Sequence, residues 1–171
     1  MIDPAKKSSS MSSLWPRVES CLPQLWRTVR AYEANPALQQ ELMQEVLLAI
    51  WQSLDRLRDT DRLLPFVLRI AHNVGASHVR EETRAPRSLS LEGDAMELAD
   101  PQHGDPADAR VQWLLCAVRT LPLPLRQVVL LQLEGFEYGE IAEMLGITID
   151  NVGVRAHRAR RKLQEMHDGH R

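Results

Sequence analysis

Cysteine is scarce in this sequence of 171 residues, and its two cysteines, Cys21 and Cys116, lie far apart without a CxxC pair. A disulfide framework or a zinc site needs more closely grouped ligands, so we expect free thiols in a reducing compartment. Long apolar runs are absent too, since nothing approaches the roughly 20 apolar residues that span a bilayer. We therefore expect a cytoplasmic protein without a membrane partner, in which residues 1–13 form a disordered tail rather than a secretory signal.

The sequence also has little that catalysis requires. It contains no glycine-rich phosphate loop and no nucleophile elbow. His72 and His78 have no carboxylate or cysteine partner at useful spacing, and His167 and His170 stand near the C-terminal end. We therefore expect a protein that is not an enzyme and that holds no metal and no cofactor.

The alternation typical of strands is missing as well, and apolar residues recur instead at helical spacing. An amphipathic helix is predicted over residues 36–54, with flanking helices near residues 22–29 and 66–74. Its apolar stripe consists of Leu38, Leu42, Val46, Ile50 and Leu54, widened by Met43, Leu47 and Trp51. Three helices of this size can bury one shared core, so we expect a helical domain over residues 14–82.

Charge is unevenly distributed along a chain whose formal net charge is −2. Residues 83–108 hold two arginines against six carboxylates and are interrupted by proline, glycine and serine, which is typical of a flexible linker. Such a linker spans roughly 25 to 30 Å on average and stretches to about 85 Å. Helical patterning resumes over residues 109–171, where residues 134–150 carry five acids and no base, and residues 153–164 five bases and no acid. The expected fold class is all-α, with two small domains joined by an acidic linker.

Residues 138–160 fit a helix-turn-helix by their stereochemistry. Ala142 lets two helices approach closely, Gly146 can take the left-handed conformation at the turn, and Thr148 can cap the second helix. The residues expected to face inward are Ile141, Leu145, Ile149, Val152, Ala156, Ala159 and Leu163. The residues left outward are Asn151, Val154, Arg155 and Arg158. This outward side suits a helix laid in the major groove of DNA. The alternative is an ordinary helix pair, because the helix dipole alone favours basic residues at a C-terminal end.

With these residues in view, the C-terminal part resembles the promoter-binding fourth domain of extracytoplasmic-function (ECF) sigma factors of the sigma-70 superfamily. The similarity runs through LPLPLRQVVLLQLEGFEYGEIAEMLGITIDNVGVRAHRARRKLQ. In the other half, NPALQQELMQEVLLAIW is similar to the family helix that docks on the polymerase clamp, and FVLRIAHNVGASHVR to its minus-ten reading helix. The resemblance implies sigma domain 2 over residues 14–82 and sigma domain 4 over residues 109–171, tethered by the acidic linker.

The resemblance also implies two partners, core RNA polymerase and promoter DNA, and assigns residues to each. The residues implied to contact polymerase are Glu41, Leu42, Gln44 and Glu45. Those implied to lie near the melted minus-ten strand are Arg69, His72, Asn73 and Arg80. Those implied to address the minus-thirty-five element and its phosphates are Asn151, Val154, Arg155, Arg158, Arg160 and Arg161. Because single-stranded bases bind through stacking and polar groups, the loop at residues 55–63 is a further candidate.

Three departures from the family pattern predict a factor that is weak on its own. Gly153 stands where the family usually has a lysine, which removes a phosphate contact and costs the helix about 1 kcal/mol. Glu81 and Glu82 follow the minus-ten helix, where the family tends to stay basic. Residues 38–40 replace an acidic patch, so that only Glu41 is left there to pair with a basic clamp.

This missing patch raises the question of control. A phosphate on Thr60 would add about −1.5 to −2 charges and replace the lost carboxylates, so phosphorylation by a Ser/Thr kinase is one expected mode. An anti-sigma factor that masks both domains is the other, and nothing in the chain selects between them. The alternative function is a sigma-like module that binds DNA or partners without initiating transcription.

Overall fold

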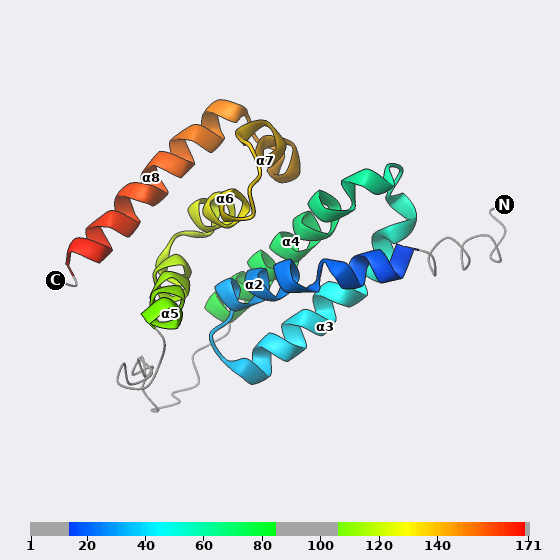
Figure 1. The fold of residues 1–171 in the computed structure, drawn as a ribbon, viewed down its shortest axis with the longest axis horizontal. Helices are drawn as coiled ribbons and strands as arrows, with labels where there is room; N and C mark the ends of the chain where they lie inside the picture. Colours follow the sequence, from blue (N-terminus) through cyan, green and yellow to red (C-terminus); the bar gives the residue numbers. More distant parts are fainter. Residues whose placement is uncertain (1–13, 85–105, 170–171) are drawn as a thin grey trace, which may run out of the picture.

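The computed structural model describes residues 14–84 and 106–169, and the regular elements in both ranges are helices (Figure 1). In the first range, called here the N-terminal unit, a helix over residues 14–20 leads into α2 (Leu22–Tyr32), α3 (Pro36–Ser53) and α4 (Leu63–Arg84). Short 3-10 turns lie between α3 and α4 at Leu54–Arg56 and Thr60–Arg62. The second range, the C-terminal unit, holds α5 (Pro106–Thr120), α6 (Leu123–Leu133), α7 (Tyr138–Leu145) and α8 (Ile149–Asp168). The predicted all-α fold class is confirmed.

Two predicted segments fall largely beyond these ranges. The predicted tail at residues 1–13 lies outside the described residues, and so does most of the predicted linker at residues 83–108. At the two edges of the linker the structure has helix instead, because α4 runs through Arg84 and α5 begins at Pro106. None of the helices described is both long enough and apolar enough to cross a membrane.

The apolar stripe of α3 forms the centre of the N-terminal core. Leu42, Val46 and Ile50 are at most 1% exposed, and α3 packs against both α2 and α4. The helical spacing of the stripe therefore placed its centre correctly. Trp51 was predicted to widen the buried stripe, but it is 44% exposed and packs edge-on against Trp15, with ring centroids 5.2 Å apart.

A buried polar pair joins α2 to α4. The Tyr32 hydroxyl and His72 Nδ1 form a hydrogen bond of 2.9 Å, and both side chains are almost completely buried. Burial raises the pKa of Tyr32 and lowers the pKa of His72 to about 4, so both groups are held neutral. The pair fixes the Tyr32 ring on the side of the N-terminal unit that faces the C-terminal unit.

The helix-turn-helix forms as its sequence predicts. Gly146 ends α7 with a left-handed φ of 66°, and the Thr148 side chain caps α8 by accepting a hydrogen bond from the Asn151 backbone N–H at 3.2 Å. The fully buried residues of α8 are Val152, Ala156 and Ala159. Ala142 is 7% exposed, which allows the close approach of the two helices. Ile149 is a correction, because it was expected to face inward and is 56% exposed.

The two units pack directly against each other (Figure 1). Helix α5 lies against α2, and α7 lies against α4. Helix α8 packs on α6 and α7, on the side away from α2 and α3 (Figure 1). The arrangement leaves the outer side of α8 open while it brings α7 close to the N-terminal unit.

Candidate nucleic-acid interface

The outward side of α8 carries the side chains predicted to meet promoter DNA. Those that are exposed are Asn151, Val154, Arg158, Arg160 and Arg161. Arg155 is half-buried. The Arg160 guanidinium donates a hydrogen bond of 2.7 Å from Nη2 to the Tyr138 hydroxyl, which holds it beside the start of α7. The amide and the apolar side chain lie near the start of this helix, where they can reach base edges. The guanidiniums lie further along it, where they can reach phosphates.

Gly153 lies in the same helix, and the fold does not require glycine there. A β-carbon at this position would have Tyr138 Cε2 as its nearest described neighbour, at an ordinary contact distance of 3.7 Å. A β-carbon therefore fits without rearranging α7 or α8. Glycine in place of the family's usual lysine removes a positive charge from this surface and lowers the helix propensity of α8. Packing does not explain why glycine stands at this position.

A second polar surface runs along α4. Its exposed side chains include Arg69, Asn73 and Arg80, which share one side of the helix by their spacing of four and seven residues. The Arg69 guanidinium lies 5.9 Å from the centre of the Phe66 ring, within the range of a cation–π contact. These three residues are placed where a ligand could reach them.

His72 does not belong to this surface. It is 0% exposed, and its Nδ1 is bonded to the Tyr32 hydroxyl. The prediction that His72 lies beside DNA is therefore wrong for this arrangement. The physical reason is helical geometry, because a step of one residue from Asn73 turns the side chain about 100° towards the core.

The predicted loop at residues 55–63 borders a pocket of about 380 Å³. Its arginines are Arg56, Arg58, Arg62 and Arg69. Leu57, Asp59, Pro65 and Phe66 also line it on this side. Glu143 and Met144 of α7 complete the wall from the C-terminal unit. Arginines beside an aromatic side chain such as Phe66 are chemically suited to a nucleotide, which presents both a phosphate and a stacking face.

On α3, the predicted polymerase contacts are only partly exposed. Glu41, Gln44 and Glu45 are exposed, but Leu42 is 1% exposed and belongs to the core, so its assignment as a surface contact is wrong here. Leu48, which the sequence interpretation did not single out, is 57% exposed one turn beyond Gln44. Together with Trp51, it adds an apolar strip to this acidic side of α3. Because Leu48 stands among several other apolar residues of the same helix, the sequence pattern did not indicate that its side chain is exposed.

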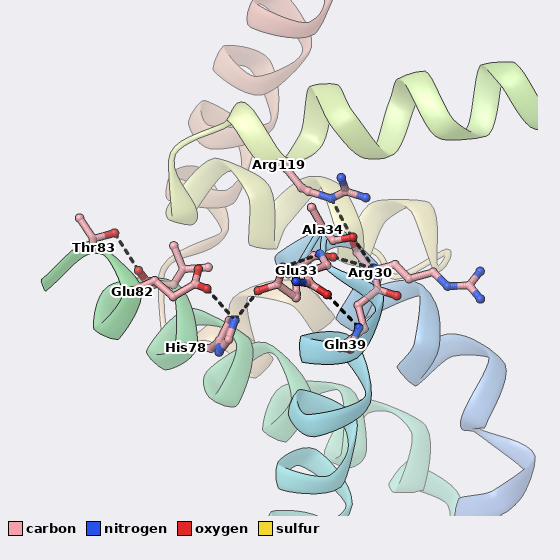
Figure 2. A network of polar contacts seen from close by, with 11 residues as sticks. Arg30, Glu33, Ala34, Gln39, His78, Glu82, Thr83 and Arg119 are labelled. Atoms are coloured by element: carbon pink, nitrogen blue, oxygen red, sulfur yellow. Dashed lines mark hydrogen bonds and ion pairs between the residues drawn. The ribbon is translucent and has the colours of Figure 1, made fainter. Parts of the chain in front are cut away.

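His78 corrects another expectation, because it does have carboxylate partners. Its Nε2 lies 2.8 Å from Glu33 Oε2 and 3.5 Å from Glu82 Oε1, and Figure 2 shows this network between α2 and α4. Glu33 is only 6% exposed and also accepts a hydrogen bond of 2.6 Å from the Asn35 backbone N–H. Glu82 follows His78 by four residues, whereas Glu33 is 45 residues away and only the fold brings it near.

Protonation in this cluster follows from burial and neighbouring charge. Burial alone would raise the pKa of Glu33, but the hydrogen bonds from His78 and Asn35 outweigh it and lower the pKa. Burial, and then the charge of Glu33, raise the pKa of Glu82. The three ligand atoms lie within 4.8 Å of one another, and each already has a polar partner in the group. The cluster is thus accounted for as an ion-pair network that ties α2 to α4.

Comparison with protein families matches both units. Residues 17–85 match the model of sigma-70 region 2, and residues 111–163 match that of sigma-70 region 4. The two matched segments contain the α4 surface and the α7–α8 helix-turn-helix described above.

Curated proteins and solved structures give the same result. The chain is 31% identical over 153 residues to the RNA polymerase sigma factor CarQ of Myxococcus xanthus, covering 88% of this chain and 83% of CarQ. It is 24% identical to the ECF RNA polymerase sigma-E factor of Escherichia coli K12, covering 72% and 70% of the two chains.

Two solved structures share the fold. One is the sigma factor RpoE in complex with the anti-sigma factor NepR from Bartonella quintana, with a TM-score of 0.72 and 23% identity over 93% of this chain and 99% of the other. The second is CnrH in complex with the cytosolic domain of CnrY, with a TM-score of 0.65 and 21% identity over 95% and 90%. The chain belongs to the extracytoplasmic-function group of the sigma-70 family of RNA polymerase sigma factors.

Proposed function

We propose that this sigma factor binds core RNA polymerase and directs it to promoters, where it starts transcription. The observation that carries the proposal is the pair of exposed polar surfaces on separate helical units, each within a matched sigma-70 region. One surface is the outward side of α8. The other consists of the arginine-lined loop at residues 55–63 and the adjoining exposed side of α4. Two surfaces of this kind allow one chain to recognise two separate DNA elements.

In this proposal the outward side of α8 binds the minus-thirty-five element in the major groove. Asn151 offers an amide that can pair with adenine, and Val154 offers an apolar contact to a thymine methyl group. The arginines further along α8 reach phosphates and set the register. Because the helix end carries five basic residues, its binding has a log–log salt slope no steeper than about −4.5.

The loop and the adjoining side of α4 would take the melted minus-ten strand. Phe66 offers an aromatic face, and the neighbouring Arg69 guanidinium offers both charge and a plane for stacking. Asn73 and Arg80 continue the polar surface along the helix. Such groups can bind the unstacked bases of a single strand. In a duplex the bases are stacked and their faces are not accessible.

Core polymerase would be bound by the exposed side of α3. Glu41 and Glu45 supply negative charge for a basic partner, while Leu48 and Trp51 supply apolar area at the centre of the contact. The acidic patch lost at residues 38–40 makes the apolar strip relatively more important. We expect affinity to depend on Leu48 more than on either single carboxylate.

Variants of the full chain test these assignments separately. Glu45→Lys should weaken polymerase binding in solution, whereas Glu19→Lys, which changes an exposed glutamate outside α3, should not. Arg158→Ala should weaken DNA binding and reduce the magnitude of the log–log salt slope by about 0.9. Arg110→Ala, which changes an exposed arginine of α5, is the control and should leave both unchanged. If Glu45→Lys and Arg158→Ala both bound as the native chain does, the assigned surfaces would be wrong.

The alternative function is a sigma-like regulator that binds DNA or partners without starting transcription. Gly153 and the reduced acidic patch favour it, because both weaken contacts on which initiation depends. Transcription with purified core polymerase discriminates between the two. A defined start site supports the proposal, and DNA binding without any start supports the alternative.

Phosphorylation of Thr60 is one proposed mode of control. Thr60 is exposed at the start of a 3-10 turn, and its carbonyl oxygen accepts a hydrogen bond of 2.8 Å from Arg17 Nη2. A phosphate there would have Arg17 and Arg62 as candidate guanidinium partners. Polymerase affinity should rise for Thr60→Glu relative to Thr60→Ala and the native chain. Equal affinity in all three would exclude this mode.

An anti-sigma factor is the other proposed mode of control. The structurally similar RpoE of Bartonella quintana is bound to the anti-sigma factor NepR, and its chain is covered almost completely by the match. A partner of the same kind would mask the surfaces of both units here. Co-purification of a stoichiometric inhibitor with the full chain, followed by loss of transcription on its addition, tests this mode.

A further inference from the structure

Two carboxylates and one imidazole converge where the end of α2 meets the last turns of α4. His78 Nε2 lies 2.8 Å from Glu33 Oε2 and 3.5 Å from Glu82 Oε1, and one ligand atom from each of the three residues lies within 4.8 Å of the other two. Figure 2 shows the three side chains pointing toward one another from the two helices. A nitrogen and two oxygens grouped in this way can bind a single metal ion.

The cluster holds more acidic than basic groups. In the part of the chain that the structure describes, neither Glu33 nor Glu82 has a lysine or arginine as an ion-pair partner, and the His78 imidazole is the one basic side chain between them. Burial, and then the charge of Glu33, raise the pKa of Glu82, because the fold holds the two carboxylates close together. A cation bound between the carboxylates would remove this repulsion.

Burial and hydrogen bonding distinguish the cluster from acidic groups on an open surface. The Glu33 side chain is 7% exposed and that of His78 is 17% exposed. Glu33 Oε1 accepts a hydrogen bond of 2.6 Å from the Asn35 backbone N–H, which leaves Oε2 directed at His78. An outer hydrogen bond of this kind orients a carboxylate ligand before a metal binds. The Glu82 side chain is 50% exposed, so an ion can enter on this side and keep a water molecule as a further ligand.

The separations of the ligand atoms fit a small divalent metal ion. Zn²⁺ binds nitrogen and oxygen at about 2.0 to 2.2 Å, so two ligand atoms at the tetrahedral angle lie about 3.4 Å apart. The 3.5 Å between His78 Nε2 and Glu82 Oε1 already agrees with this value, and the 2.8 Å to Glu33 Oε2 has to widen by about half an ångström. The imidazole favours zinc and its first-row neighbours over Mg²⁺ and Ca²⁺, which prefer oxygen ligands alone.

We propose that Glu33, His78 and Glu82 form a binding site for one Zn²⁺ ion or a similar first-row divalent metal ion, with water as the fourth ligand. Without the ion, a hydrogen bond joins His78 Nε2 to Glu33 Oε2. The proton of this hydrogen bond leaves to solvent when the ion takes its place, since the ligating imidazole nitrogen must be unprotonated. The bound ion then connects the end of α2 to the last turns of α4.

Titration of the full chain with Zn²⁺ in a calorimeter tests the ligands. The native chain should bind one ion tightly, and Glu82→Gln and His78→Gln should each weaken binding at least about tenfold. His157→Gln is the matched control, because it removes an exposed imidazole of α8 outside the cluster and should bind as the native chain does. A native chain that binds no zinc would overturn the inference. Native affinity in either cluster variant would overturn it too, because the ion would then lie elsewhere.

X-ray absorption at the zinc edge identifies the atoms around the ion. The native chain with one equivalent of Zn²⁺ should show nitrogen and oxygen neighbours at about 2.0 to 2.2 Å, with the scattering pattern of an imidazole. A sulfur neighbour at about 2.3 Å would place the ion on one of the free thiols, Cys21 or Cys116, and would overturn the assignment.

Thermal unfolding tests whether the ion stabilises the folded protein. Zn²⁺ should raise the melting temperature of the native chain and of His157→Gln, because the three ligands are brought together only in the folded state. The rise should be much smaller for Glu82→Gln, which changes an exposed side chain and keeps the fold testable. Mg²⁺ at the same concentration should leave the melting temperature unchanged. An equal rise in all three proteins, or an equal rise with Mg²⁺, would contradict a site built by these residues.

Discussion

A β-carbon on Gly75 of α4 would lie 2.7 Å from the Cδ2 and Cγ atoms of Tyr32 in α2. No real side chain tolerates that distance, so glycine is required for α2 and α4 to pack with the Tyr32 ring between them. The Tyr32 hydroxyl in turn shares a hydrogen bond with His72 Nδ1, and the Arg126 guanidinium lies over the Tyr32 ring. The glycine thus supports both the N-terminal core and the boundary with the C-terminal unit.

Gly75→Ala is therefore expected to destabilise the protein by about 1–3 kcal/mol, the usual cost of overpacking. Urea unfolding monitored by circular dichroism measures the change. Gly139→Ala is the control, because a β-carbon at this exposed helical glycine meets no described atom within 4 Å. The control should leave stability unchanged or raise it slightly. Equal effects at both positions would contradict the tight Gly75–Tyr32 contact.

Gly153→Lys should strengthen DNA binding by the outward side of α8. A β-carbon fits at this position, and one added phosphate contact should steepen the log–log salt slope by about 0.9. Helix stability should rise by about 1 kcal/mol, since glycine is a poor helix former. Gly153→Gln separates the effects, because it should give the gain in stability without the change in slope. A slope that stays the same in the lysine variant would argue against a phosphate at this point.

The burial of His72 predicts a specific pH dependence. Its folded-state pKa of about 4 lies below the usual value of 6.5, so the unfolded chain binds the proton more tightly. Stability should accordingly fall as the pH drops from about 6.5 to about 4, by up to about 3 kcal/mol, and this contribution stops changing below pH 4. His72→Gln should flatten the slope between pH 7 and 4.5, whereas His157→Gln at an exposed position of α8 should retain it. A native slope in the His72 variant would show that another group titrates.

The two glutamates that flank His78 should differ in their contribution to stability. Glu33→Gln should cost about 1–3 kcal/mol, because Glu33 is 6% exposed and bonded to both His78 and the Asn35 N–H. Glu82→Gln should cost less than about 1 kcal/mol, because this side chain is 50% exposed. Thermal and chemical unfolding of both variants measure the difference. The reverse order would mean that the buried pair is not the structural link between α2 and α4.

Local sequence signals predicted the elements well. The i+4 spacing of Leu42, Val46 and Ile50 marked the core side of α3, because helical periodicity survives in any packed helix. Gly146 and Thr148 marked the turn of the helix-turn-helix, because both act through backbone geometry that depends on neighbouring residues alone. Features that depend on local stereochemistry could therefore be predicted before the fold was known.

Features that depend on tertiary contacts could not be predicted. His72 was assigned to a surface because a family motif does not state which side of its helix is buried, and it proved to belong to the core. For Leu42 the helical spacing correctly predicted the core, whereas the family motif assigned it to a surface. The Glu33–His78 pair spans 45 residues, and Arg27–Glu134 spans 107, so no spacing rule connects them. The acidic run at residues 134–150 was visible in the sequence, but its contact with Arg27 and Arg62 needed the fold.

Transcription by purified core RNA polymerase tests the central claim most directly. The native chain should give a transcript with one defined 5′ end on a promoter chosen by footprinting. Glu45→Lys should reduce its yield through weaker polymerase binding, and Arg158→Ala through weaker DNA binding, with Glu19→Lys and Arg110→Ala as controls. A native chain that binds both promoter DNA and polymerase but yields no defined transcript would contradict the account.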